Sequence, residues 1–168
     1  MTPQRILVVY HTSSGNTERV AQAIAQALGA DLERIREVKP RPVDIKGKGL
    51  KNFGNMGRVV FGGFGKKVVD IHPPEHNPAE YDLLILGTPV YASSLPMPTR
   101  AYLQAHADDI RQAAFFCTGE SPKNKEIFNL MEDALCQAPV AAVAFHAPAI
   151  REDDFAAQVD HLIEQLPA

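Results

Sequence analysis

Short apolar segments and helical periods alternate along nearly the whole chain. Each apolar segment has the length of a buried strand and is bounded by glycine, proline or polar residues. Apolar side chains at helical spacing fill most of the intervals between these segments. Strands that alternate in this way with helices form parallel sheets covered by helices on both faces. The sequence therefore predicts an α/β fold with a doubly wound, five-stranded parallel sheet. The expected strands cover residues 6–10, 31–35, 83–86, 113–117 and 140–145. The first expected helix ends at Leu28, a weaker one covers 98–107, and two more cover 127–135 and 155–166.

Residues 39–78 follow this pattern less clearly. Glycine and proline recur there so often that we expect a loop leading into a short second helix near residues 50–64. Residues 39–67 hold eight lysines and arginines against one acid, Asp44, a balance of +7, while the other nine basic and nineteen acidic residues give −10. The basic stretch is either a solvated helix face or a positive rim for an anionic substrate, a cofactor phosphate or an acidic partner protein.

Length and composition are those of one compact domain, since the chain has 168 residues and 45% of them are hydrophobic. No apolar stretch approaches the ~18 to 20 residues of a membrane span, and no cleavage-site pattern follows the N-terminus. We therefore expect a cytoplasmic protein without a membrane or nucleic-acid partner. The net charge of −3 is too close to zero to indicate a particular kind of partner. Cys117 and Cys136 match no metal or redox spacing, so both are expected to be reduced and buried.

A hydroxyl-rich run follows the first predicted strand and opens the first predicted helix. It reads Thr12-Ser13-Ser14-Gly15-Asn16-Thr17. Such a turn offers O–H donors, free backbone N–H groups and the positive end of the helix dipole, which together can hold a phosphate monoester without lysine or arginine. A phosphate held in this way is typical of a permanently bound ligand. The same residue types also form ordinary helix caps with nothing bound.

Two further loops are expected beside this run. In open parallel sheets the ligand lies beyond the carboxyl ends of the strands, where the strand order reverses. For the order 2-1-3-4-5 this crevice falls between the first and third strands, and residues 87–96 and 118–122 border it. The first of these loops exposes backbone amides around one aromatic ring, Tyr91. The backbone amides of this loop could bind the polar edge of a flat heterocycle while the Tyr91 ring covers the face of that heterocycle. Alternatively, Tyr91 could be a packing residue.

Other ligand classes of this architecture lack their motifs here. The usual dinucleotide site needs G-x-G-x-x-G after the first strand, where only Gly15 occurs. A nucleoside triphosphate loop needs G-x-x-x-x-G-K-[ST], and the nearest candidate, Gly65-Lys66-Lys67, has neither the first glycine nor the hydroxyl. No carboxylate ends the first or third strand to accept a phosphoryl group, and no spacing of histidine, cysteine and acids predicts a metal site.

The Thr12–Thr17 run resembles the phosphate loop of the flavodoxins, T/S-x-T-G-x-T, with Ser14 in place of the central threonine. Residues 87–91, Gly-Thr-Pro-Val-Tyr, are similar to the second flavin-binding loop of the wider flavodoxin-like group. The order of elements over nearly the whole chain also fits. The resemblance implies a single flavodoxin-like domain over residues 1–168, a strand order of 2-1-3-4-5 and a non-covalently bound FMN.

The resemblance also implies which residues would contact FMN. Flavodoxins commonly cover the flavin with a tryptophan; this chain has none, so Phe53, Phe61 or Phe64 is expected to replace it. Gly87, Ala92 and Gly119 are small enough to allow the backbone to approach the flavin. His11, beside the phosphate loop, either titrates near neutral pH or is a structural hydrogen-bonding group. The phosphate would be held by Thr12, Ser13, Ser14, Gly15, Asn16 and Thr17, the isoalloxazine would be lined by Thr88, Pro89, Val90, Tyr91 and Ala92, and Thr118 and Gly119 would lie at its other edge.

Three functions remain open at this point. The first is electron transfer by FMN between redox partners, with no catalytic acid, base or metal. The second is an NAD(P)H-dependent FMN oxidoreductase that reduces quinones or similar small-molecule acceptors, which the basic residues 39–67 favour. The third is a flavin-free interaction domain that keeps only the fold.

Overall fold

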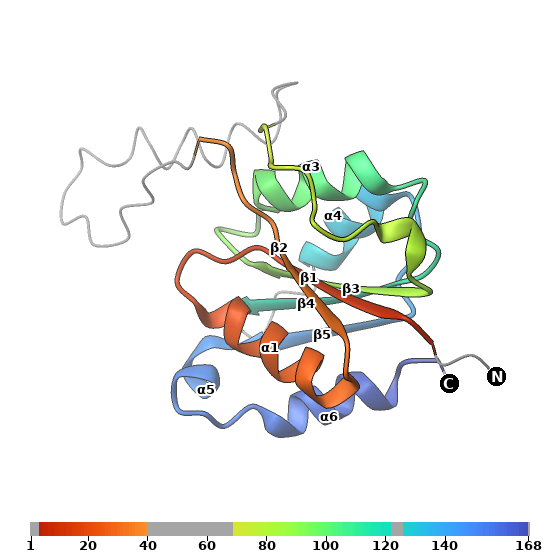
Figure 1. Ribbon diagram of the computed structural model, residues 1–168. Helices are drawn as coiled ribbons and strands as arrows, with labels where there is room; N and C mark the ends of the chain where they lie inside the picture. Colours follow the sequence, from red (N-terminus) through yellow and green to blue (C-terminus); the bar gives the residue numbers. More distant parts are fainter. Residues whose placement is uncertain (1–3, 40–68, 122–125, 168) are drawn as a thin grey trace, which may run out of the picture.

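The computed structural model describes residues 4–39, 69–121 and 126–167, and within them it has one five-stranded sheet (Figure 1). All neighbouring strands pair in parallel, in the order β2-β1-β3-β4-β5. The predicted fold class and strand order are therefore confirmed. The strands are β1 (Ile6–Tyr10), β2 (Asp31–Arg34), β3 (Leu83–Pro89), β4 (Ala113–Gly119) and β5 (Ala141–His146).

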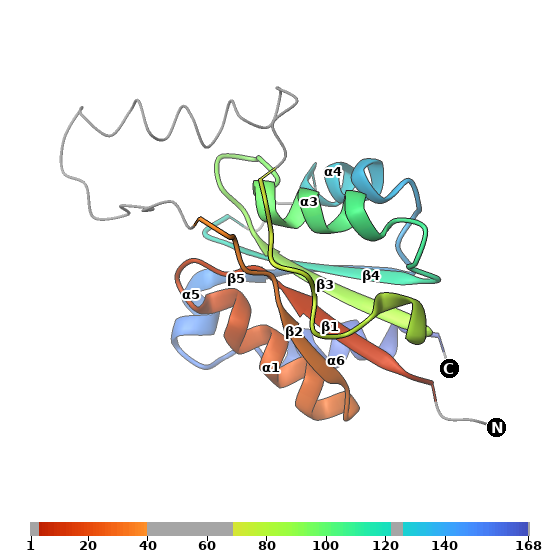
Figure 2. The same cartoon turned by 45° about the horizontal axis from the view of Figure 1, so that its top comes forward.

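Helices cover both faces of the sheet, each over its own apolar core (Figures 1 and 2). One face carries α1 (Asn16–Leu28), the short α5 (Ala147–Arg151) and α6 (Ala156–Glu164), and the other carries α3 (Met97–His106) and α4 (Glu126–Leu135). A single 3₁₀ turn, η2 (Pro78–Glu80), precedes β3. The helix expected near residues 50–64 lies outside the described residues, as do Phe53, Phe61, Phe64 and nearly all of the basic stretch.

Helix α1 forms for the reasons that its sequence indicates. Its stripe of Val20, Ala21 and Ile24 is fully buried against the sheet. Gly29 ends the helix in the left-handed conformation, with φ of 61°, and the N–H of Ala30 donates to the carbonyl of Ala25 at 2.9 Å. No helix of the described residues is long and apolar enough to cross a membrane.

Strand β3 runs three residues further than its apolar core predicts. Gly87, Thr88 and Pro89 are all buried and stay in register with Phe116, Cys117 and Thr118 of β4. Glycine and proline suggested a turn at Gly87, but pairing with a long neighbouring strand keeps this segment extended. The result is that the second loop begins only at Val90.

Gly87 makes room for an aromatic ring of the core. A Cβ at this position would lie 1.9 Å from Cζ of Phe116, whose ring is fully buried and packs edge to face with Phe145 at 5.9 Å. Packing against Phe116 is thus a sufficient reason for a glycine at this position, and the backbone approach to the flavin stays a prediction.

The two cysteines differ in exposure. Cys117 in β4 is buried, as predicted, and burial raises the pKa of its thiol to about 12. Cys136 is exposed, so the prediction that both are buried is wrong. It follows the last residue of α4 with φ of 58°, a left-handed position that turns the chain away from the helix.

The chain returns to the edge of the sheet immediately after residue 68. The N–H of Val38 donates to the carbonyl of Asp70 at 2.9 Å, and the N–H of His72 donates to that of Arg36 at 2.8 Å. The buried carboxylate of Glu33 then accepts the backbone N–H groups of Glu75 and His76 and contacts Nδ1 of His76 at 2.8 Å. Residues 69–77 are thereby held against β2.

Candidate functional site

The three predicted loops meet at the carboxyl ends of β1, β3 and β4. The N–H of His11, just after β1, donates to the carbonyl of Gly87 at 3.0 Å, and the N–H of Val90 donates to the carbonyl of Thr118 at 2.9 Å. The strand order reverses between β1 and β3, so the loops border the crevice where ligands bind in open parallel sheets.

The phosphate loop is shaped by Thr12 and Gly15. The hydroxyl oxygen of Thr12 accepts the N–H of Gly15 at 3.0 Å. Gly15 has φ of 91°, and a Cβ on it would meet nothing within 4 Å, so the space above the loop is open. The glycine is needed here for its backbone conformation rather than for close packing.

Backbone amides at the start of α1 are free to bind a ligand. The N–H of Arg19 donates to the carbonyl of Gly15, which leaves the N–H groups of Asn16, Thr17 and Glu18 without an acceptor in the helix. Ser13 and Ser14 are exposed beside them. Several neutral donors thus gather at the positive end of a helix dipole, a donor set that fits a phosphate monoester.

The arginine closest to this loop in α1 is engaged elsewhere. Arg19 donates through Nη1 to the carbonyl of Ile150 and through Nη2 to Asp153 at 2.8 Å, so its guanidinium lies toward α5. The predicted cradle of uncharged groups at residues 12–17 therefore keeps its character in the folded chain.

The second loop contains a strained turn next to Tyr91. The N–H of Ser94 donates to the carbonyl of Tyr91 at 2.8 Å, and the two residues between them, Ala92 and Ser93, have φ of 46° and 59°. Left-handed backbone costs roughly 1–2 kcal/mol per non-glycine residue, and nothing in the composition of this loop predicts it. The exposed Ala92 at the mouth of the site is part of this turn.

Tyr91 connects the second loop to the phosphate loop. Its side chain is partly buried, and this burial raises the pKa of the phenol, while a hydrogen bond with the side chain of Ser13 acts in the opposite direction. The ring thus lies between the two loops, where it could cover a bound heterocycle.

Thr88 and the third loop use their side chains internally. The hydroxyl of Thr88 is fully buried and lies 2.9 Å from that of Thr99 in α3, so this side chain faces away from the crevice. The hydroxyl of Thr118 is likewise buried, 2.8 Å from that of Thr17. Pro89 is buried, and Val90 and Gly119 are partly exposed.

The last residues of β5 and α5 support the third loop, and sequence analysis did not predict this. Arg151 holds Glu120 in a two-point ion pair, with contacts of 2.7 and 3.2 Å, and this contact lowers the pKa of the Glu120 carboxyl. Nε2 of His146 lies 2.9 Å from the carbonyl oxygen of Glu120. The pairing of Gly119 with His146 in the sheet brings Glu120 close to His146 and Arg151. A pairing between such distant residues cannot be predicted from a local sequence pattern.

Of the two alternatives for His11, burial favours the structural one over titration near neutral pH. Burial lowers its pKa to about 4; a hydrogen bond with the backbone of Ile35 opposes this shift, and the charge of Arg34 adds to it. Its buried Nδ1 has no hydrogen-bond partner among the described residues. His11 is therefore a structural group beside the phosphate loop.

We expect His11 to make the protein less stable in mild acid. Because its folded pKa of about 4 lies below the ordinary 6.5, the unfolded chain takes up the proton first, and stability falls as pH drops from 6.5 toward 4. Between pH 7 and pH 5 the loss is about 2 kcal/mol in the free energy of unfolding. Urea titrations at both pH values should show a smaller loss for His11→Gln. The exposed His72→Gln is the control, and equal pH dependence in His11→Gln and the parent protein would contradict this assignment.

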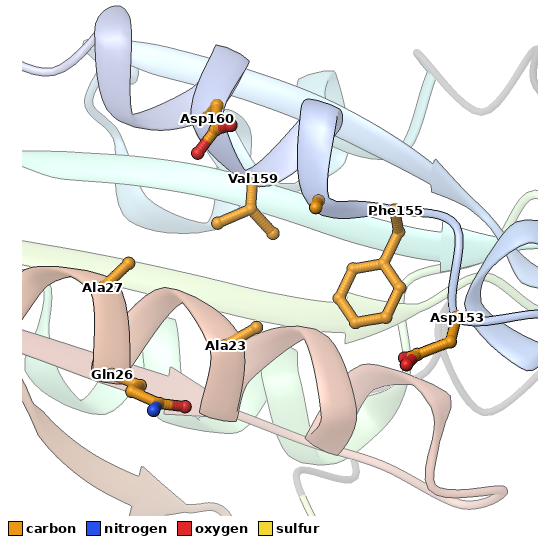
Figure 3. Close-up of a pocket in the computed structure, with 8 residues that line it drawn as sticks. Ala23, Gln26, Ala27, Asp153, Phe155, Val159 and Asp160 are labelled. Carbon is orange, nitrogen blue, oxygen red and sulfur yellow. The ribbon is translucent and has the colours of Figure 1, made fainter.

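A groove elsewhere in the molecule has different chemistry. It has a volume of about 440 Å³ and lies between α1 and the α5–α6 region, away from the three loops (Figure 3). Its walls are mostly alanine, Phe155 and Val159, with Asp153 and Asp160 at the edges. It presents no convergent set of N–H and O–H donors, so the loops remain the candidate site.

The fold and the three loops define a flavodoxin-like protein. The family model described as Flavodoxin matches residues 5–134, and the chain belongs to this family. A comparison with curated protein sequences finds no match.

Solved structures share the fold at low sequence identity. The flavoprotein in complex with FMN from Lactobacillus acidophilus NCFM has a TM-score of 0.71 and 16% identity, covering 95% of this chain and 99% of its own. A putative flavoprotein from Bacteroides eggerthii has a TM-score of 0.69 and 20% identity, covering 95% and 98%. An NADH:FMN oxidoreductase in its apo form has a TM-score of 0.53 and 16% identity, covering 98% and 91%.

Proposed function

We propose that this protein binds FMN non-covalently in the three-loop site and transfers electrons with it. The observation that carries the proposal is the uncharged cradle at residues 12–17, where amides of α1 without an acceptor in the helix lie beside exposed Ser14 and the open space over Gly15. The family and the FMN complex of a structural relative support the same cofactor. Neutral donors do not neutralise the charge of a phosphate dianion. This suits a phosphate that anchors the cofactor and takes no part in the reaction.

The residues of the site would position FMN rather than exchange protons. When bound, FMN supplies the redox chemistry itself. Residues 12–17 would hold its phosphate, the backbone of 88–92 would face the isoalloxazine, and Tyr91 would exclude water from one side of the ring.

The ionisable groups of the three loops do not suit acid–base catalysis near neutral pH. In the parts of the loops that the structure describes, these groups are His11, Tyr91 and Glu120. Burial lowers the pKa of His11 to about 4 and raises that of Tyr91, and the ion pair with Arg151 lowers that of Glu120. An electron carrier that serves a redox partner protein in the cytoplasm needs no such group, whereas many flavin enzymes do.

A second function, NAD(P)H-dependent reduction of a quinone or similar acceptor, is favoured by one observation. The +7 stretch at residues 39–67 leaves and rejoins the described chain beside the carboxyl end of β2, the strand next to the phosphate loop. Positive charge at that place would attract a nucleotide phosphate or an anionic acceptor.

Absorption spectra and titrations test both functions. The purified protein, or the apoprotein after addition of FMN, should show bands near ~370 and ~450 nm, the ordinary signature of oxidised flavin. A colourless protein that does not bind added FMN would exclude both functions and support the flavin-free interaction domain. Stepwise reduction that stops at a one-electron-reduced form supports the carrier, and steady oxidation of NADPH or NADH with a quinone supports the oxidoreductase.

A further inference from the structure

Two pairs of buried threonines tie the loops of the site to the rest of the fold. The hydroxyl oxygens of Thr17 and Thr118 lie 2.8 Å apart, and those of Thr88 and Thr99 lie 2.9 Å apart. All four residues are almost fully buried. Buried hydroxyl groups of this kind form a hydrogen bond with each other because no water is available to them.

The first pair connects the phosphate loop to the sheet. Thr17 is in the first turn of α1, where its N–H is one of the amides without an acceptor in the helix. Thr118 is near the end of β4, paired with Pro89 on one side and Phe145 on the other. The contact thus anchors the first turn of α1 to the interior of the sheet, across 101 residues of sequence.

Neither side chain of this pair is open to a ligand. Thr17 is 1% exposed and Thr118 is 3% exposed, and one of the two hydroxyls donates to the other. What Thr17 can present to a phosphate is its backbone N–H, whose direction depends on how the first turn is held. A misdirected amide loses much of its hydrogen bond, because these bonds weaken steeply with angle.

We propose that Thr17 and Thr118 are positioning residues for the phosphate group of the cofactor. Thr118 acts through Thr17 on the amides of α1 and does not touch the isoalloxazine. This inference rests on the proposed function. It gives Thr118 a role at the phosphate end of FMN, whereas the resemblance to flavodoxins placed this residue at the edge of the isoalloxazine.

The second pair supplies a matched control. Thr88 and Thr99 have the same chemistry and burial, but they connect the loop beside Tyr91 to the first turn of α3. Loss of this bond should disturb the ring side of the site and leave the phosphate loop unchanged. Thr118→Val and Thr99→Val each remove one hydroxyl with little change of shape.

The experiment compares FMN with riboflavin, which lacks the phosphate. Dissociation constants of both flavins are measured for the apoprotein of the parent chain, Thr118→Val, Thr118→Ser and Thr99→Val by flavin fluorescence quenching. We expect Thr118→Val to weaken FMN binding about tenfold and riboflavin binding less than about twofold, the loss of one hydrogen bond of ordinary strength. Thr118→Ser should restore FMN affinity, and Thr99→Val should affect both flavins equally.

The double variant Thr17→Val/Thr118→Val keeps the proposal testable if a single variant fails to fold. Replacing both partners by apolar groups of the same shape leaves no buried hydroxyl unpaired, so this variant should fold even where a single one does not. Its FMN affinity should equal that of Thr118→Val, because both lack the same bond.

Two kinds of failure can be told apart. Equal losses for FMN and riboflavin in Thr118→Val, no rescue by serine, or an FMN affinity of the double variant clearly below that of Thr118→Val would overturn the positioning role while FMN binding stands. A parent protein that binds neither flavin would overturn the proposed function itself, and the positioning role with it.

Discussion

Gly87→Ala is expected to destabilise the protein by about 3 kcal/mol, a large share of the roughly 5–15 kcal/mol by which native proteins are stable. The new Cβ would lie 1.9 Å from Cζ of Phe116 and 2.4 Å from both of its Cε atoms. Phe116 cannot move aside, because it is fully buried and packs against Phe145. Urea denaturation of the apoprotein measures the loss directly.

Removing the obstructing atoms should restore stability to the alanine variant. Leucine lacks the Cζ and Cε atoms of phenylalanine, so Gly87→Ala should cost much less in a Phe116→Leu background than in the parent protein. A Gly87→Ala protein that stays stable but no longer binds flavin would contradict the packing role and return this glycine to the cofactor.

Ser14→Glu is expected to weaken FMN binding by about 100-fold or more without affecting riboflavin. Ser14 is exposed in the phosphate loop, so the substitution leaves the core unchanged. A carboxylate there would repel a phosphate dianion by several kcal/mol at an effective dielectric constant of about 20, and it would compete for the same amides of α1.

Ser14→Gln separates charge from size in this prediction. Glutamine has the shape of glutamate without its charge and should weaken FMN binding only slightly. The difference between the two variants should shrink at high salt, since exposed charges are screened. Equal losses in both variants, or a loss of riboflavin binding with glutamate, would place the phosphate elsewhere.

Hydrophobic pattern and local turn chemistry were sufficient to predict the sheet and its main helices. The runs at residues 6–10 and 113–117 are strands because both faces of a parallel sheet are buried, which makes a strand continuously apolar. Gly29 ends α1 as predicted because its left-handed conformation favours glycine. The short helix α5 was not predicted, since its five residues carry no apolar period.

The loops of the site could be predicted from sequence, but the direction of their side chains could not. Thr12 to Thr17 and Tyr91 do lie at the same edge of the sheet, because the carboxyl ends of parallel strands meet there. The partners of Thr88 and Thr118 are set by packing between distant elements, so the sequence did not predict that these hydroxyls face inward. The neutral state of His11 likewise depends on burial that no local pattern indicates.

The hydrogen bond from Val38 to Asp70 joins the two points between which residues 40–68 are inserted. Because these points are neighbours, the length of the insertion adds little to the entropy of closing the loop, which grows only slowly with residue number. A shortened chain that passes from Lys39 to Val69 through a tight turn should therefore retain the sheet, so segments of other lengths and sequences could be exchanged at this junction without loss of the fold.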